Sequence, residues 1–550
     1  MMSDSNLLRL IREESALQPT RIVAMSALAG LCSAAVLGIV NAAAAEAASR
    51  SPATTAYFFA FLGLTATFLL TKRFILLTSI HETEQIIHRI RLRVVEKVLR
   101  SDLLALDRIG RGNILASVGK DTQVLSQAAF MLTNAAEALA LLTFALLYLG
   151  WLSLPAFIIG GLFMAAAAIF HSVKMNRVEQ GLREALNKEN ACLASINDFL
   201  SGFREIKLHQ RRGEDMSRHL EVESQQAAIS KSGALEMLAR QYSLSQAMLY
   251  MLIGTMVFVV PIFSDSFSNV AVKTATTVLF MVSSLTILIA AIPVFAEANA
   301  AAGHISGIEK ELNESSWPTD PATDLPIEHE FKEIVLQQVS YKHEKRGDDT
   351  PFTLGPINLR FKAGELVFIS GGNGSGKSTL VNLLIGLYRP SSGTITIDSK
   401  EVDSHSLVAY RNLFAVVFSD FHLFKRLFGM MDTAQERIDE LLQLLEMEKK
   451  TSVVNGEFSS LNLSSGQRKR IALLVALLEE KPIIVLDEWA ADQDPQFREK
   501  FYRIMLPELK RLGKTIIAVT HDERYFEIAD RRISLDYGQI SADEYRTSHA

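Results

Sequence analysis

The sequence has few cysteines and no excess of positive charge. It contains two cysteines, Cys32 and Cys192, and neither lies in a CxxC or other metal-binding spacing, so we predict no disulfide framework and no cysteine-bound metal. The formal net charge is −5, and the basic residues are dispersed rather than aligned in a stripe. That pattern argues against nucleic-acid binding.

Apolar residues are abundant instead. They make up 49% of the 550 residues, and the mean hydropathy is +0.18. Six runs are long enough, at roughly 20 apolar residues each, to cross a bilayer as helices. We place these spans at residues 21–45, 54–77, 129–150, 152–172, 243–263 and 272–296. Residues 41–45 resemble a signal-peptide cleavage site, but the length of this first run and the spans after it favour a membrane helix.

The basic residues between the spans predict their orientation. They precede the first span and crowd two long loops, between spans two and three and between spans four and five. The other connections carry only Arg50 and Lys273 at their margins. Because loops rich in Lys and Arg stay in the cytoplasm, we expect a multi-pass protein with both termini cytoplasmic.

The two basic loops are about 50 and 70 residues long and have helical periodicity. We expect long helices that continue out of the membrane, with tight turns or short cross-helices near residues 107–112 and 202–207. These loops are either solvated hairpins or a mechanical coupling to the C-terminal half, and the ATPase motifs described below favour coupling. Glu137 lies inside the third span, where three roles stay open: contact with a cationic or polar substrate, a pair with a neighbouring helix, or a place near the membrane surface.

A break in the helical pattern marks the domain boundary. Residues 311–328 hold three prolines among acidic and polar residues, a composition typical of a linker. We therefore predict a transmembrane domain over 1–310 and a second domain, with α/β character, over 329–550.

The second domain contains a phosphate-binding loop in its proper context. A buried strand, Val367–Ile369, runs into a glycine-rich turn that opens a helix, as this motif requires. Backbone amides would wrap the phosphates of ATP, Lys377 would reach the β- and γ-phosphates, and the hydroxyl of Ser378 would bind Mg²⁺. The predicted ATP contacts here are Gly371, Gly372, Asn373, Gly374, Ser375, Gly376, Lys377, Ser378 and Thr379.

Two further strands end in residues suited to hydrolysis. The strand at 483–486 leads into Asp487 and Glu488, and the strand at 515–520 leads into His521. We assign Asp487 to Mg²⁺ and Glu488 to the general base that activates water. The imidazole of His521 could hydrogen-bond the γ-phosphate and sense its loss.

A second phosphate-binding motif lies between these strands. Leu463, Ser464, Ser465, Gly466 and Gln467 open a helix, and a hydroxyl with amides at a helix start can hold a phosphate. One chain cannot use both sites on one nucleotide. The motif therefore predicts a second identical chain and a symmetric dimer with two ATP molecules at the seam.

This set of motifs resembles an ATP-binding cassette, and the six spans resemble the exporter class of those transporters. Residues 354–359, 371–378 and 487–495 are similar to the bacterial exporters of cyclic peptides and siderophore peptides, the pyoverdine-precursor, syringomycin and microcin J25 group. The resemblance implies a type I exporter fold, six transmembrane helices fused to an α/β P-loop cassette.

The same resemblance implies a function. It suggests a homodimer in the bacterial inner membrane that hydrolyses ATP with Mg²⁺ and exports a peptide or siderophore-type peptide by alternating access. A periplasmic or outer-membrane export partner is possible. A lipid or drug flippase of the same fold is the alternative, and a non-transporting regulatory ATPase is a weaker one, because Glu488 and the second motif are both present.

Several positions depart from the family pattern. Ser419 stands where cassettes carry a Gln that contacts Mg²⁺, and its shorter side chain offers an oxygen that could contact the metal in place of that Gln. The aromatic residue that stacks on adenine falls at His343, with Tyr341 as a second candidate on the same strand face. Ser465 replaces a usual Gly. Asp494 matches the Asp that closes the loop after the catalytic Glu and is expected to cross the dimer seam.

Overall fold

The computed structural model describes residues 5–14, 19–47, 53–259, 271–314, 331–342 and 352–546. The chain divides into two compact units. The helical unit comprises Met1–Val95 and Gly112–Lys310, and the α/β unit comprises Glu96–Arg111 together with Glu311–Ala550. The second division lies at the start of the predicted 311–328 linker, most of which lies outside the described residues.

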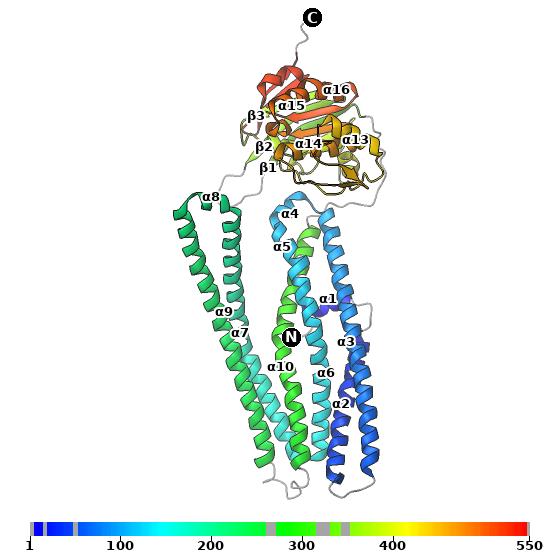
Figure 1. Ribbon diagram of the computed structural model, residues 1–550, viewed down its shortest axis with the longest axis vertical. Coiled ribbons are helices and arrows are strands. Elements are labelled where there is room, and N and C mark those ends of the chain that lie inside the picture. Colours follow the sequence, from blue (N-terminus) through cyan, green and yellow to red (C-terminus); the bar gives the residue numbers. More distant parts are fainter. Residues whose placement is uncertain are drawn as a thin grey trace. The chain divides into compact units, whose positions relative to one another are not determined.

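Long helices build the helical unit (Figure 1). The helices of this unit, long and short, are α1 Asn6–Glu14, α2 Pro19–Ala47, α3 Ala53–Arg100, α5 Arg111–Ala116, α6 Thr122–Leu152, α7 Leu154–Ser201, α8 Phe203–Leu208, α9 Gln210–Gly254 and α10 Ala271–Glu314. A backbone in hydrocarbon must satisfy its own hydrogen bonds, which is why apolar stretches of this length are helical. Ser153 separates α6 from α7, because its hydroxyl accepts from the amide of Ala156 and Pro155 begins the new helix.

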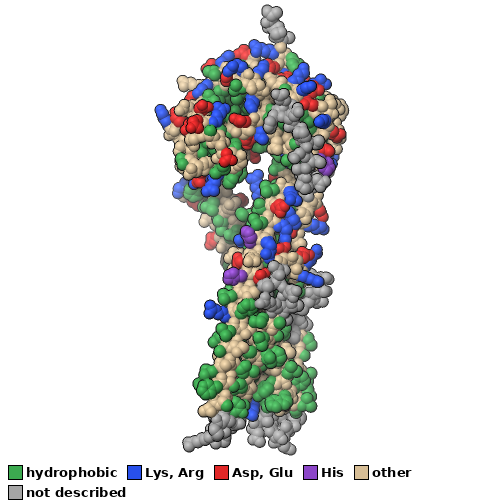
Figure 2. Space-filling view, turned by 90° about the vertical axis from the view of Figure 1, so that its right-hand side faces the viewer, with side chains coloured by type: hydrophobic (Ala, Val, Ile, Leu, Met, Phe, Trp, Pro, Cys, Tyr) green, Lys and Arg blue, Asp and Glu red, His purple; other side chains and the backbone are tan. Residues whose placement is uncertain are grey.

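Five helices in the described part of the chain are long and apolar enough to cross a membrane. They overlap the predicted first, second, third, fifth and sixth spans, and residues 260–263 of the fifth lie outside the described residues. The predicted fourth span falls in α7, whose described apolar segment is Leu154–Ala166. Large apolar side chains such as Phe59 and Leu70 face outward, as expected for contact with lipid. Figure 2 shows hydrophobic side chains gathered over the lower part of this unit and charged ones above them.

Helix pairs in this unit approach through small residues. α2 packs along α6 and α7 packs along α9. At Gly30 of α2, an added Cβ would lie 2.6 Å from the Cβ of Ala140 and 2.7 Å from the amide nitrogen of Leu141. Small residues at such contacts let two backbones come close, which is a main source of packing energy in a membrane.

The helices reach well beyond a bilayer. α3 and α7 each have 48 residues, which corresponds to about 72 Å at 1.5 Å per residue, against about 30 Å of hydrocarbon. Short helices follow them, α4 (Leu103–Ile109) after α3 and α8 after α7. Gly110 ends α4 with φ 84°, a conformation that glycine adopts without strain. The predicted long loops are therefore helical extensions with short cross-helices at their tips.

The α/β unit is built on two sheets. Strand order is β12-β11-β3-β10-β9-β6 in the larger sheet and β2-β1-β4-β5 in the smaller one. The strands are β1 Glu333–Lys342, β2 Thr353–Lys362, β3 Leu366–Gly371, β4 Ser392–Ile397, β5 Lys400–Glu401, β6 Phe414–Val417, β9 Ile483–Asp487, β10 Thr515–Val519, β11 Arg531–Asp536 and β12 Gln539–Tyr545, with a separate hairpin of β7 Val453–Val454 and β8 Glu457–Phe458.

Two hydrophobic cores lie on opposite faces of the larger sheet. Leu366 and Phe368 of β3 enter one core, while Val367 and Ile369 enter the other, as the period of two along a strand dictates. The helices of this unit pack against these faces (Figure 1). They are α11 Lys377–Leu384, α12 Leu407–Arg411, α13 Gln435–Leu444, α14 Ser465–Leu478, α15 Pro495–Lys500 and α16 Leu506–Arg511.

Candidate nucleotide site

The predicted site residues meet at one edge of the larger sheet. β3 pairs in parallel with β10, β10 with β9, and β9 with β6. Parallel strands present their carboxyl ends at the same edge, where α/β proteins bind ligands. The phosphate loop follows β3, and His521 follows β10. Asp487 ends β9, Glu488 comes directly after it, and Ser419 follows β6. The fold thus brings together residues that lie up to 150 positions apart in the chain.

The phosphate loop has the geometry that its glycines predict. α11 begins at Lys377, and Gly376 before it has φ 101°. A Cβ at Gly376 would lie 2.8 Å from Leu354 Cδ1, so this position requires glycine twice over. The buried Lys377 ammonium donates to the carbonyls of Gly371 and Gly372, both at 3.0 Å. These two bonds use two of the three N–H donors of the ammonium, so one donor remains for a phosphate.

Asp487 offers an oxygen suited to a hard cation. The hydroxyl of Ser378 donates to its Oδ2 at 3.4 Å. Its Oδ1 is buried and has no hydrogen-bond partner among the residues that the structure describes. Burial raises the pKa of the Asp487 carboxyl, and the nearby Ser419 opposes that rise. A desolvated carboxylate oxygen beside two hydroxyl side chains fits Mg²⁺, which takes oxygen ligands and is commonly held by one or two carboxylates plus substrate phosphates.

Glu488 and His521 face each other across the β9 and β10 ends. The Nε2 atom of His521 lies 3.2 Å from Oε1 of Glu488, and both side chains are partly exposed, at 47% and 38%. The backbone of Glu488 is left-handed, with φ 49° and ψ 35°. A non-glycine residue persists in that conformation only when its surroundings hold it there, and such positions are frequent at functional sites.

The second phosphate motif forms the capped start of α14. Ser464 Oγ accepts from the amide of Gln467 at 3.4 Å, and Gln467 Oε1 accepts from the amide of Ser464 at 3.1 Å. This reciprocal pair is a capping box. Ser464 and Ser465 are exposed, whereas an added Cβ at Gly466 would lie 2.6 Å from the carbonyl oxygen of Asp492. The motif is thus open to solvent on one side and packed against the loop after Glu488 on the other.

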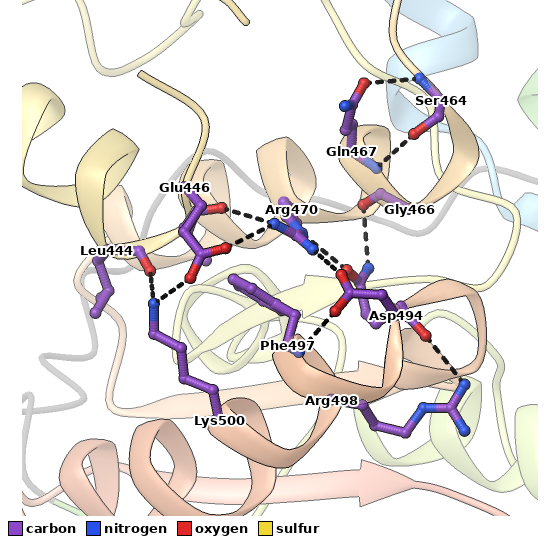
Figure 3. A network of polar contacts seen from close by, with 12 residues as sticks. Leu444, Glu446, Ser464, Gly466, Gln467, Arg470, Asp494, Phe497, Arg498 and Lys500 are labelled. Atoms are coloured by element: carbon purple, nitrogen blue, oxygen red, sulfur yellow. Dashed lines mark hydrogen bonds and ion pairs between the residues drawn. The ribbon is translucent and has the colours of Figure 1, made fainter. Parts of the chain in front are cut away.

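Asp494 is held within its own chain (Figure 3). Its carboxylate caps α15 by accepting from the amide of Phe497 at 2.9 Å, and Arg470 Nη2 donates to it at 2.6 Å. The amide of Phe497, followed by the Arg470 charge, holds the pKa of the Asp494 carboxyl below its ordinary value. The side chain remains 54% exposed although it caps α15. The predicted contact of Asp494 with a second chain across the dimer seam stays a proposal.

The two candidates for adenine stacking have different outcomes. The ring of Tyr341 is 3% exposed and stacks on Tyr388 with 4.9 Å between ring centroids. A ring covered in this way has little surface left for an adenine, and the stacking role of either candidate stays a prediction. His343 lies outside the described residues. The position of Tyr341 along its strand does not predict this burial, because Tyr388 comes from a separate segment of the chain.

The tip of the first long loop belongs to the α/β unit. Leu104 of α4 packs against the second hydrophobic core, together with residues of β1, β2 and α11. Burial raises the pKa of the Asp102 carboxyl, and the Arg411 and Arg389 guanidinium groups oppose that rise. Residues 96–111 therefore contact the rest of this unit through both apolar and charged side chains. That these contacts couple the cassette to the membrane helices stays a prediction.

Glu137 of α6 has a partner on α3. Its carboxylate lies 3.2 Å from Nζ of Lys72, and the two side chains are 17% and 36% exposed. An ion pair lowers the cost of both charges among apolar helices. Of the roles open from the sequence, pairing with a neighbouring helix is the one that this geometry displays. Sequence reasoning had not connected the two residues, since 65 positions separate them.

Comparison with known proteins agrees with this architecture. Residues 22–290 match the ABC transporter transmembrane region family, and residues 354–491 match the ABC transporter family. The ATP-binding protein SyrD of Pseudomonas syringae pv. syringae is 32% identical over 532 residues, which cover 94% of this chain and 92% of SyrD. An ATP-dependent lipid A-core flippase of Paraburkholderia xenovorans is 24% identical, over 83% of this chain and 78% of its own.

A shorter match and a solved structure extend the comparison. The probable syringafactin export ATP-binding/permease protein SyfD of Pseudomonas syringae is 33% identical over 36% of this chain and 32% of its own. A solved bacterial Atm1-family ABC exporter with ATP bound has the same fold, with a TM-score of 0.77 at 16% identity over 96% of this chain and 95% of that one. The chain belongs to the ABC transporter family: it is an ATP-hydrolysing ABC exporter half-transporter, with one transmembrane domain and one cassette.

Proposed function

We propose that two copies of this chain hydrolyse ATP at two shared sites and thereby export a peptide or siderophore-type peptide across the bacterial inner membrane. The observation that carries the ATPase part is the sheet edge that gathers Lys377, Ser378, Asp487, Glu488 and His521. The signature segment 463–467 starts a different element, α14, and leaves its two serines open to a nucleotide held by a partner.

The residues divide the chemistry among themselves. Lys377 and the loop amides hold the phosphates and orient them for attack. Glu488 accepts a proton from the attacking water, and His521 fixes the Glu488 carboxylate and the γ-phosphate. Asp487 and Ser378 would hold Mg²⁺, with Ser419 nearby, and the ion would supply charge stabilisation for the transferring phosphoryl group. Binding of ATP closes the two cassettes only to the extent that the closed pair binds it more tightly.

The shared sites can be tested by mixing two inactive variants. Lys377→Met removes the phosphate contact of one site, and Ser464→Trp obstructs the signature of the other. Each variant alone is expected to be inactive. Because a mixed dimer pairs the intact loop of one chain with the intact signature of the other, co-expression should restore ATPase activity in purified protein. If the mixture stays as inactive as the two separate variants, each site is built from a single chain and the proposed homodimer is wrong.

The cargo assignment rests on similarity. Residues 354–359, 371–378 and 487–495 carry the likeness to peptide exporters, and SyfD is described as a probable syringafactin exporter. The likeness to a lipid A-core flippase extends over more of the chain but at lower identity, and it keeps lipid transport as the second candidate. ATPase activity in lipid nanodiscs separates the two: stimulation by peptides supports the first, and stimulation by lipid A alone supports the second.

Orientation and the role of Glu137 belong to the same proposal. The basic loops favour cytoplasmic termini and loading of substrate from the cytoplasm. The Lys72–Glu137 pair is a charged feature of the described spans that a polar or cationic substrate could engage, by displacing Lys72 from the carboxylate. A downstream periplasmic or outer-membrane partner would fit a two-membrane cell.

A further inference from the structure

A buried lysine on the signature helix holds the backbone of the proposed general base. The Lys469 side chain is 7% exposed. Its Nζ donates to the carbonyl oxygen of Glu488 at 2.8 Å and forms an ion pair with Asp492 at 2.8 Å. In return, Nε1 of the buried Trp489 donates to the carbonyl oxygen of Lys469 at 2.7 Å. Helix α14 and the loop after β9 thus each donate a hydrogen bond to a backbone carbonyl of the other.

These bonds act on the strained position itself. The amide of Glu488 donates to the carbonyl of Val519 at 3.1 Å, its carbonyl accepts from Lys469, and its carboxylate meets His521. With φ 49°, the residue is left-handed, and such a backbone persists only where neighbours determine it. Lys469 supplies a charged donor that comes from outside the sheet edge.

The far end of the same loop is tied to the next residue of the helix. Arg470 donates through Nε to Oε1 of Gln493 at 2.9 Å and through Nη2 to Oδ2 of Asp494 at 2.6 Å (Figure 3). Gln493 in turn donates to the carbonyl of Gly466 at 3.0 Å. The loop 488–494 is therefore clamped at both ends by two consecutive cations of α14, one turn after the signature serines.

We infer that Lys469 is a positioning residue for Glu488, and that α14 carries the state of the signature segment to the general base of the same chain. The inference rests on the proposed roles of Glu488 and of the signature segment. A nucleotide bound by the partner would touch the start of α14, and α14 would then fix the angle at which Glu488 faces its own nucleotide.

Two substitutions separate the charge from the hydrogen bond. Lys469→Met removes both, whereas Lys469→Gln keeps a donor for the Glu488 carbonyl and loses the partner of Asp492. Lys510→Met is the control. Lys510 also forms an ion pair, with 2.6 Å between its Nζ and Oδ1 of Asp530, but neither residue belongs to the nucleotide site. ATPase rates and ATP binding would be measured on the full-length protein in lipid nanodiscs.

We expect kcat to fall about tenfold to a hundredfold in Lys469→Met, since misplacement of a reacting group by about 1 Å costs that much. Lys469→Gln should fall between it and the wild type, and Lys510→Met should equal the wild type. KM for ATP should change less than about twofold in all three, because the phosphate loop is untouched. The inference is overturned if Lys469→Met keeps the wild-type kcat. It is also overturned if KM for ATP rises by the same factor as kcat falls.

A second measurement separates positioning from a general structural effect. In a Glu488→Gln background the carboxylate is gone, so adding Lys469→Met should cause no further loss of the residual rate. A further tenfold loss in the double variant means that Lys469 acts elsewhere, and the inference fails. If Glu488→Gln alone hydrolyses ATP at the wild-type rate, the proposed role of Glu488 is wrong. The single variant thus tests the role of Glu488, and the double variant tests the role of Lys469.

Discussion

Replacing Gly466 by alanine tests the packing between the signature helix and the catalytic loop. The new Cβ would lie 2.6 Å from the carbonyl oxygen of Asp492, whereas ordinary contact begins near 3.4 Å. The obstacle is backbone, and the carbonyl of Gly466 is also bound by Gln493 at 3.0 Å. Helix and loop must therefore separate by about 0.8 Å, which is overpacking that costs about 1–3 kcal/mol.

Two readouts follow from that displacement. For a domain of this size, about 1–3 kcal/mol lowers Tm by about 2–12 °C, and a shift near 1 Å at the general base should lower kcat by about tenfold or more. The control is Gly233→Ala, where an added Cβ meets nothing within 4 Å. The Tm and the ATPase rate of full-length Gly466→Ala should both be lower than those of the wild type. A variant with the wild-type Tm and kcat refutes the close contact.

Three other predictions use the same protein. Leu104→Ala removes an apolar contact of α4 with the cassette core, so peptide-stimulated ATPase should fall while basal ATPase stays within about twofold. Lys72→Met leaves the Glu137 carboxylate unpaired among apolar helices, so Tm should fall, and adding Glu137→Gln should recover it; an unchanged Tm in the single variant contradicts the pair. Because folding lowers the pKa of Asp494, its contribution to stability is present above its ordinary pKa and is lost as pH falls through the lower folded value. The Tm difference between the wild type and Asp494→Asn should therefore be constant near pH 7 and shrink below about pH 4; a difference that grows on acidification has the wrong sign.

The nucleotide residues were predictable because their signals are local. Each motif sits directly at the end of an apolar strand, and parallel strands place their ends together. The sequence alone therefore placed Lys377, Asp487, Glu488 and His521 just after strands, and the parallel pairing of those strands brings them to one edge. The long loops were predictable for a similar reason, since helical periodicity continued beyond the apolar runs and glycines marked the turns.

What sequence reasoning missed depends on contacts between distant segments. Lys469 stands in a run of three basic residues and reads as part of a solvated face, yet the fold buries it against Glu488, 19 positions away. Tyr341 is a candidate for adenine stacking by its place on the strand, and the fold stacks it on Tyr388 from a separate segment. Glu137 found Lys72 on another helix. No local pattern encodes these pairings, because each is set by how separate elements pack.

ATP hydrolysis assisted by Glu488 is proposed to drive peptide export. The most direct test is mass spectrometry of the medium and the cell contents of a strain lacking this protein, complemented with the wild type or with Glu488→Gln. The account predicts that the same peptide masses accumulate in cells and disappear from the medium in the deletion and in the Glu488→Gln strain, and return with the wild type. Unchanged peptides, or changes confined to lipids, would contradict it.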